Sequence, residues 1–269
     1  MQPREPAQAR PGELASAARI YDRLLGGAHN FAVDRAAAQR LIEIFPDVRR
    51  VTWANRAFLR RVVTFLLQEG IDQFLDVGSG IPAVGSVHEI AAEINPAAHI
   101  VYVDTDPVVL QHGLAILQGH PSAAAIQADA RQPRLILEHA EVQRLLDFRR
   151  PVAVLLVALL QFVPNDDEAV ALVAEFKQAL PSGGYLALAH PTPDGVPAVT
   201  LEQLERLYEG TTNPARARPR AQVERFFDGL EVVDPGVVFV PQWRPETDRD
   251  VFVHEPGRSS NVGGVGRKL

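Results

Sequence analysis

Three aspartates close three successive apolar runs of the sequence, and a glycine turn follows the first of them. Asp76 stands at the end of the first run, Asp104 directly after the second and Asp129 directly after the third. Asp104 comes 24 residues after Gly80 (104 − 80), a spacing at which a carboxylate accepts hydrogen bonds from ribose hydroxyls. Since the carboxyl ends of parallel strands meet at one crevice, the three acids are expected to converge. The pattern predicts a nucleoside-binding site.

The turn after the first run is Gly78-Ser79-Gly80. Glycines let a ligand approach the backbone, and the helix that follows offers free N–H groups. An ordinary tight turn between a strand and a helix is the alternative interpretation. A dinucleotide site needs a third glycine, which residues 81–83 (Ile-Pro-Ala) do not supply, so an NAD(P)-dependent oxidoreductase is disfavoured.

The acid before the turn bears on the charge of the ligand. Asp76 favours a cation over a diphosphate. S-adenosylmethionine carries an ammonium, a sulfonium and a ribose but no phosphate, and it fits these residues better than a dinucleotide. Asp129 can accept a hydrogen bond from an adenine amino group, although a helix cap is an equally good interpretation. Thr105 and Ala130, which adjoin the second and third acids, are counted with this cofactor site.

The elements that must position these side chains follow from the hydrophobic pattern. Up to residue 70 apolar residues recur at helical spacing, and beyond it short apolar runs alternate with helical segments. This alternation is typical of βαβ units and predicts an α/β fold with a doubly wound, Rossmann-like parallel sheet. Strands are expected at 74–77, 99–103, 125–128, 152–160 and 184–189, with helices at 84–94, 107–117 and 166–180.

Beyond His190 the pattern is looser. Helices are expected at 200–208 and 220–227, and closing strands at 230–233, 237–240 and 251–253. Residues 1–13, rich in Pro, Arg and Gln, are predicted to be disordered. No convincing linker divides the remainder, so residues 71–269 are expected to form one domain, preceded by a helical extension at 14–70.

The chain resembles the class I S-adenosylmethionine-dependent methyltransferases in its three strand-end acids, its glycine turn and the segment 180–186 (Leu-Pro-Ser-Gly-Gly-Tyr-Leu). More narrowly, it resembles an actinobacterial family of methyltransferase-like proteins of unassigned substrate, over nearly the whole chain. The segments that carry this narrower resemblance are 18–27 (Ala-Arg-Ile-Tyr-Asp-Arg-Leu-Leu-Gly-Gly), Asn30-Phe31 with Asp34, 54–61, 87–89, 101–104, 160–164 and 264–268.

The resemblance implies a sheet of seven strands, the last antiparallel, with S-adenosylmethionine across the strand ends. It places Gly78 and Gly80 against the cofactor, Asp104 on the ribose, Asp129 near the adenine and Asp76 near the methionine end. The sequence departs from the family pattern at two positions. Gln161 stands where histidine is expected and Ser86 where asparagine is expected, so a proton-transfer role at residue 161 is in doubt.

The N-terminal helical region supplies a second group of candidates. Tyr21, Asn30, Phe31 and Arg56 belong to it, and we expect residues 14–70 to fold over the crevice as a lid that packs on the cofactor. The paired glycines at 26–27 suggest its hinge. Plain helical packing is the alternative interpretation of these side chains.

Candidates for a catalytic base are few. Methyl transfer depends mainly on proximity and orientation, and a base is needed only when the nucleophile starts protonated. His190, at the end of the fifth strand, and Tyr21 are the two residues we expect in that role, although a strand-end histidine is more often structural. No histidine or carboxylate spacing indicates a metal site. The string Arg216, Arg218, Arg220 favours a solvated loop over a site for an acidic substrate.

The composition of the chain limits the classes of partner that it is expected to bind. The 269 residues carry 27 Lys and Arg against 33 Asp and Glu, a formal charge of −6, which disfavours binding to a nucleic acid backbone. Without cysteine there are no disulfides, and the longest apolar run, 152–160, is too short to cross a bilayer. A cytoplasmic methyltransferase with a small-molecule acceptor is therefore expected. A regulatory protein that binds S-adenosylmethionine or its product S-adenosylhomocysteine without turnover is the alternative. No oligomeric state is predicted.

Overall fold

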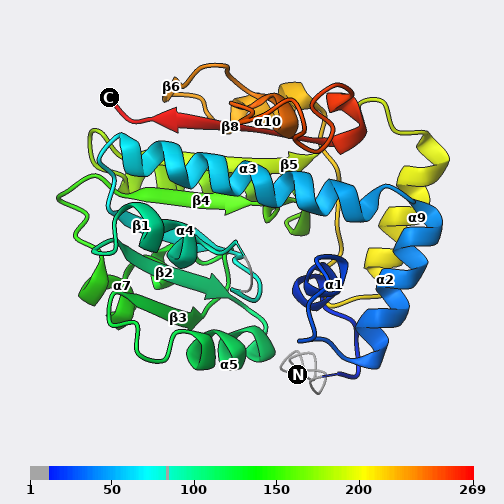
Figure 1. Cartoon of the computed structure of the whole chain (residues 1–269), viewed down its shortest axis with the longest axis horizontal. Coiled ribbons are helices and arrows are strands. Elements are labelled where there is room, and N and C mark those ends of the chain that lie inside the picture. Colours follow the sequence, from blue (N-terminus) through cyan, green and yellow to red (C-terminus); the bar gives the residue numbers. More distant parts are fainter. Residues whose placement is uncertain (1–11, 83–84) are drawn as a thin grey trace, which may run out of the picture.

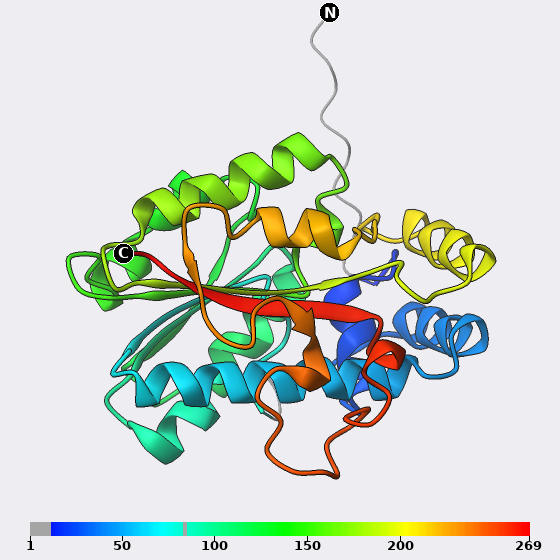
Figure 2. The ribbon, with the colours of Figure 1, turned by 90° about the horizontal axis from the view of Figure 1, so that it is seen from above.

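The centre of the fold is a mixed β-sheet with helices on both faces (Figures 1 and 2). A computed structural model describes residues 12–82 and 85–269. Within these residues the strand order is β3-β2-β1-β4-β5-β8-β6, and a short β7 also pairs with β8. The strands are β1 (Gln73–Val77), β2 (His99–Asp104), β3 (Ala123–Gln127), β4 (Ala153–Val157), β5 (Tyr185–Pro191), β6 (Glu231–Val232), β7 (Val238–Phe239) and β8 (Asn261–Arg267).

The first five strands run parallel, as the apolar runs predict. Every residue of β1 is buried, as are four of the five residues of β4, because helices cover both faces of the sheet. Alternate side chains of β1 enter two different apolar clusters, with Phe74 on one face and Leu75 on the other. Burial on both faces therefore fixes the position of the carboxyl ends of the strands, where the predicted acids lie.

Helices complete the two outer layers. One face is covered by α3 (Val48–Gln68) and α4 (Val87–Ile94), and the other by α8 (Asp166–Ala179) and α10 (Arg220–Arg225) (Figure 2). The remaining helices between strands are α5 (Pro107–Ile116), α6 (Pro133–Leu137) and α7 (Ala140–Leu145), with short 3-10 turns at η1 (Leu160–Phe162), η2 (Val240–Gln242) and η3 (Pro256–Ser259).

The C-terminal strand corrects the sequence prediction. Residues 251–253, predicted as a strand, lie in turns, whereas β8 lies further on and pairs antiparallel with β5. β8 carries glycine at positions 263 and 266 because its neighbours leave no room there for a side chain. A Cβ on Gly263 would lie 2.9 Å from both Leu188 O and the Phe58 ring, and one on Gly266 would lie 2.9 Å from the Phe227 ring. The expected antiparallel last strand is confirmed, and β7 makes the sheet eight-stranded rather than seven-stranded.

Three helices stand beyond the carboxyl ends of the parallel strands: α1 (Ala17–Leu24), α2 (Ala32–Ile44) and α9 (Ala198–Glu209) (Figures 1 and 2). α2 packs against α9, although the two are separated by more than 150 residues in the sequence. Their apolar residues form a third cluster, distinct from the two that line the sheet. The helical character predicted for 14–70 is confirmed up to Gln68, whereas most of the disorder predicted for 1–13 lies outside the described residues.

No helix among the described residues is long and apolar enough to span a membrane.

Candidate active site

A cavity of about 660 Å³ lies between the carboxyl ends of the strands and the helices α1, α2, α3 and α9. Its wall includes the residues after β1, β2, β3 and β4, so the topology brings the predicted strand-end acids together. Ten of the thirteen predicted site residues line it. They are Tyr21, Arg56, Asp76, Gly78, Ser79, Gly80, Asp104, Thr105, Asp129 and Ala130.

The turn after β1 needs its glycines for two separate reasons. Gly78 and Gly80 have positive φ angles of 72° and 63°, which residues with a side chain adopt at a cost. A Cβ on Gly78 would also lie 2.5 Å from the side chain of Leu159. The turn is held against β2, because the Gly80 N–H donates to Asp104 Oδ2 over 2.9 Å.

Asp76 is a buried acid in the cavity wall. Burial raises its pKa to about 7, the Arg56 guanidinium acts to lower it, and Asp104 acts to raise it further. Arg56 is itself buried, and its Nε has no hydrogen-bond partner among the described residues. The site thus presents an acid that ionises near neutrality beside a cation with an unused donor. This pair matches the ammonium and carboxylate of an amino acid group.

Asp104 and Asp129 differ in how their oxygens are used. Burial raises the pKa of Asp104 to about 6, while backbone N–H donors at Asp106 and Gly80 act to lower it. Burial also acts to raise the pKa of Asp129, but hydrogen bonds from Arg131 outweigh it and the pKa is lowered. Arg131 Nη2 lies 2.6 Å from Asp129 Oδ2. Asp129 is therefore an ionised acid already paired with an arginine at the cavity wall.

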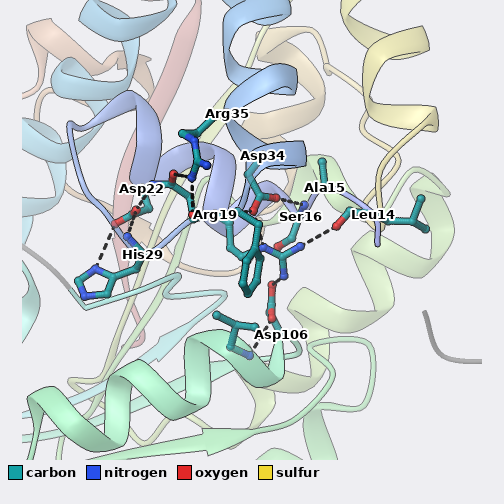
Figure 3. A network of polar contacts seen from close by, with 12 residues as sticks. Leu14, Ala15, Ser16, Arg19, Asp22, His29, Asp34, Arg35 and Asp106 are labelled. Carbon is teal, nitrogen blue, oxygen red and sulfur yellow. Dashed lines mark hydrogen bonds and ion pairs between the residues drawn. The ribbon is translucent and has the colours of Figure 1, made fainter. Parts of the chain in front are cut away.

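A buried network joins the N-terminal helices to the cofactor edge of the sheet (Figure 3). Arg19 on α1 donates to Asp34 on α2 over 2.9 Å, to Asp106 at the start of α5 over 2.6 Å, and to the Leu14 carbonyl over 2.7 Å. Asp34 also accepts from the backbone N–H of Ser16. Because Arg19 pairs with an acid on α2 and with an acid at the start of α5, the network holds α1 in position over the strand ends.

Two predicted cofactor residues lie elsewhere. Within the described residues, Asn30 and Phe31 are not part of the cavity wall. The Asn30 side chain donates to Asp22 Oδ2 and to the Gly27 carbonyl, which fixes the turn after α1. The Phe31 backbone N–H is capped by Asp34, and its ring is partly exposed, with the Arg19 guanidinium 5.2 Å from its centroid. Both therefore support the turn between α1 and α2 and do not reach the cavity.

His190 does not reach the cavity wall of the described structure either. Its ring is fully buried, with Nδ1 2.7 Å from the Pro191 carbonyl and Nε2 3.0 Å from Arg218 Nη1. Since a carbonyl only accepts, Nδ1 donates and Nε2 accepts from Arg218. Burial lowers the pKa of His190 to about 3, which keeps the ring neutral. These contacts leave His190 no free nitrogen for proton transfer, and they correct its expected role as a base.

The arginine string is not a solvated loop throughout. Arg218 is almost completely buried and donates to the carbonyls of Leu160 and Val163 as well as to Asp166. Arg220 follows the prediction and pairs with Glu224 on the surface. Arg216 lines the cavity and donates to the Pro164 carbonyl. The three differ because the buried guanidinium of Arg218 donates to the carbonyls of Leu160 in η1 and of Val163 after it, whereas the side chains of Arg216 and Arg220 are about half exposed.

Sequence reasoning did not assign Asn55 to the cavity wall, although a signal was present. Residues 48, 51, 52, 55, 56 and 59 of α3 all line the cavity, at the spacing of one helical face. Asn55 is a buried amide within this stripe, and Gln161 is a second buried amide just after β4. No group of three or more metal-ligating side chains occurs among residues 12–82 and 85–269.

A parallel sheet with its last strand inserted antiparallel beside β5, and an acid-lined cavity across the carboxyl edge, is the architecture of class I methyltransferases. This chain belongs to the S-adenosyl methyltransferase family, whose sequence profile matches residues 5–269. It is therefore an S-adenosylmethionine-dependent methyltransferase with S-adenosylmethionine as its cofactor. Among curated proteins, no sequence matches it.

Two solved structures share both sequence and fold with this chain. A protein of Thermobifida fusca YX described as a methyltransferase is 39% identical, over 98% of this chain and 99% of that chain, with a TM-score of 0.89. A DUF574 family protein of Streptomyces avermitilis MA-4680 is 37% identical, over 96% and 99%, with a TM-score of 0.90. An O-methyltransferase family protein of Burkholderia thailandensis shares the fold alone, at 15% identity over 84% of this chain and 61% of that chain (TM-score 0.53).

Proposed function

We propose that this protein transfers the methyl group of S-adenosylmethionine to a small-molecule acceptor bound in the same cavity. The observation that carries the proposal is the extent of the cavity, which continues from the acid-lined strand ends to the apolar faces of α1, α2 and α9. Its volume of about 660 Å³ lies within the range of cavities that enclose small ligands. A protein that binds the cofactor without turnover needs only the first of these two regions, and no observation favours that alternative.

The donor chemistry of the wall supports one orientation of the cofactor. Asp104 accepts hydrogen bonds from the ribose hydroxyls, and Asp129 lies beside the adenine. Asp76 faces the ammonium of the methionine portion, and the unpartnered Arg56 Nε donates to its carboxylate. The remaining assigned residues hold the cofactor through their backbone or by close approach; they are Gly78, Ser79, Gly80, Thr105 and Ala130.

The chain contributes mainly orientation to the reaction. When bound, S-adenosylmethionine supplies an electrophilic methyl group, which moves to the lone pair of the acceptor while the bonding pair stays on sulfur and S-adenosylhomocysteine forms. The cavity wall aligns the acceptor with that methyl group. Tyr21 lines the cavity, where its hydroxyl accepts from Asn55 Nδ2 over 3.1 Å and donates to the Thr52 carbonyl over 3.3 Å. We assign Tyr21 to orienting Asn55, and the acceptor's proton leaves to solvent.

We further propose that residues 14–70 act as a lid on the domain formed by residues 71–269. Support comes from Arg19, which ties α1 to α5, and from Ser16 and Tyr21, which line the cavity. Enclosure of the cofactor under α1 predicts slower amide hydrogen exchange in this helix when S-adenosylmethionine binds. Equal exchange rates in α1 with and without S-adenosylmethionine would leave residues 14–70 as a structural extension only.

Isothermal titration tests the cofactor site directly. We expect micromolar binding of S-adenosylmethionine and S-adenosylhomocysteine, and no binding of NAD. The Asp104→Ala variant loses the ribose contacts, for which charged hydrogen bonds contribute about 1.5–3 kcal/mol each, so its affinity should fall at least about 10-fold. Glu205→Ala, which removes an exposed carboxylate of α9 in the same wall, is the matched control. No binding of either sulfur nucleoside to the unaltered protein would refute the proposed function.

A further inference from the structure

The part of the cavity away from the strand ends has walls of a different chemistry. Six of its lining residues belong to the third apolar cluster: Leu24, Leu41, Phe45, Val48, Leu204 and Tyr208. We call the space that they enclose the outer compartment. None of the six carries a charge, and they come from α1, α2, the start of α3 and α9, including the residue that follows α2.

The cavity-lining stripe of α3 fixes where the outer compartment lies relative to the cofactor residues. The stripe begins at Val48, in the outer compartment, and reaches Arg56, beside Asp76, eight residues later. At 1.5 Å per residue this is a distance of about 12 Å along the helix axis. The outer compartment and the site proposed for the methionine portion are therefore neighbouring parts of one cavity, with Asn55 near the boundary.

Two buried amide oxygens without partners mark this boundary. Asn55 donates through Nδ2 to the Tyr21 hydroxyl, and Gln161 donates through Nε2 to the Ala158 carbonyl. Asn55 Oδ1 and Gln161 Oε1 accept nothing from the described residues. Both residues line the cavity and are more than nine-tenths buried. A buried acceptor left unpaired costs about 1–3 kcal/mol, so a bound N–H or O–H group that pairs with one of them is stabilised.

We propose that the outer compartment is the acceptor subsite, and that it takes an uncharged, largely apolar ring compound whose reacting hydroxyl or N–H donates to Asn55 Oδ1 or Gln161 Oε1. This inference rests on the proposed function and adds the chemical class of the acceptor. A hydrogen bond to either amide oxygen would hold the reacting group at the cofactor side of the boundary. The ring would then lie toward α2 and α9.

Charge and packing both support an uncharged ring. A charged acceptor would lose its hydration among the six apolar residues without gaining an ion pair. Of the charged residues in the same wall, Glu205 is exposed on α9, and Arg216 is engaged with the Pro164 carbonyl and with Asp166. Aromatic side chains of the wall can pack against a bound ring. The ring centroids of Tyr208 and Phe162 lie 5.8 Å apart, and both residues line the cavity. An apolar space of this kind is unusual in close-packed interiors unless something fills it.

Binding of two matched naphthalenes tests the class of ligand. We would titrate 1-naphthol, an uncharged ring with one hydroxyl, and naphthalene-1-sulfonate, its charged counterpart, into the full-length protein saturated with S-adenosylhomocysteine. We expect 1-naphthol to bind at least 10-fold more tightly. Absence of 1-naphthol binding, or equal affinity for the sulfonate, would overturn the inference. Failure of S-adenosylhomocysteine itself to bind is a separate result that refutes the proposed function, and the titration of 1-naphthol into the free protein still decides the inference.

Two substitutions on α9 localise the binding. Leu204→Lys places a charge in the outer compartment and should weaken 1-naphthol binding at least 10-fold without changing the affinity for S-adenosylmethionine. Val199→Lys adds the same charge on the same helix at a position that is 61% exposed and does not line the cavity among the described residues, and it should change neither affinity. Equal 1-naphthol affinities in the two variants would place the ligand elsewhere.

A comparison of two ligands tests the proposed hydrogen bond to the amide oxygens. 1-Methoxynaphthalene has the ring of 1-naphthol but no hydrogen-bond donor, so the ratio of the two affinities reports the proposed hydrogen bond. We expect the ratio to fall several-fold when both oxygens are removed in Asn55→Leu/Gln161→Met. Gln222→Met removes another unpartnered buried oxygen, on α10 and outside the cavity wall, and should leave the ratio unchanged. An unchanged ratio in the double variant would show that neither oxygen holds the acceptor.

Discussion

Arg19 Nη1 lies 2.6 Å from Asp106 Oδ2, and this ion pair ties the first helix of the chain to the residue that caps α5 (Figure 3). Asp106 in turn donates its backbone N–H to Asp104 Oδ1, so the same short chain of contacts reaches the acid proposed to hold the ribose. The position of α1 over the cavity and the orientation of Asp104 are therefore coupled through two hydrogen bonds.

Arg19→Ala should lower the free energy of unfolding by about 3–5 kcal/mol, because it leaves Asp34 and Asp106 buried without their cation. Urea denaturation of the cofactor-free protein measures the change. Arg40→Ala removes an arginine from α2 that is 66% exposed and pairs with Glu43, and it should cost less than about 0.5 kcal/mol. Similar losses in the two variants would mean that the Arg19 network contributes nothing beyond a surface ion pair.

The affinity for S-adenosylmethionine should rise between pH 6 and pH 8. With a pKa of about 7 in the free protein, Asp76 is mostly protonated at pH 6 and mostly ionised at pH 8. Only the ionised form attracts the cofactor's ammonium, whose own pKa near 8 sets the upper end of the window. We expect binding about 10-fold weaker at pH 6 than at pH 8, measured by titration calorimetry.

The Asp76→Asn variant separates this effect from other titrations. It should bind weakly throughout, and most of the rise in affinity between pH 6 and pH 7.5 should be lost, because the carboxyl that titrates there is gone. A residual loss of affinity toward pH 6 is expected from Asp104, whose pKa is about 6. A variant that keeps the full pH dependence of the unaltered protein would show that Asp76 does not face the ammonium.

The parallel half of the fold could be predicted because its signals are local. Apolar runs such as 74–77 and 99–103 are buried on both faces, and the acids that follow them are brought together by parallel topology alone. The antiparallel strand β8 could not be predicted in this way. Its glycines have low strand propensity, and they are explained by contacts with Phe58 and Phe227, which lie far away in the sequence.

The site residues show the same difference between local sequence signals and contacts that are distant in the sequence. The spacing predicted that Asp76, Asp104 and Gly78 lie together, and they line one cavity because parallel topology brings the strand ends together. The role expected of His190 failed because the side chain at a strand end points to one face or the other, and here Arg218 and Pro191 enclose it. Which face it takes depends on a loop 28 residues further along the chain, which no local pattern reveals.

Gly26 and Gly27, which follow α1, are each required for a different structural reason. Gly26 has a φ of 92° with free space around it, whereas a Cβ on Gly27 would lie 2.1 Å from Asp22 Oδ1. Gly26→Ala should cost about 1 kcal/mol through backbone strain. Gly27→Ala should cost about 2–3 kcal/mol, because Asp22 must give up its hydrogen bonds to His29 and Asn30. Thermal unfolding of both variants gives the comparison, and equal losses would contradict the steric explanation.

Arg218 should be the most important of the three arginines for stability. Its guanidinium serves the carbonyls of Leu160 and Val163 and the ring of His190, and it holds η1 beside the cavity. Arg218→Met keeps the volume but leaves these buried acceptors unpaired, which we expect to lower the free energy of unfolding by about 3–5 kcal/mol. Arg220→Met, on the surface two residues away, should change it by less than about 0.5 kcal/mol.

Because η1 carries Gln161, Arg218→Met should also weaken 1-naphthol binding while a stable fraction still binds S-adenosylmethionine. A variant as stable as Arg220→Met would show that the buried guanidinium does not hold η1 in place.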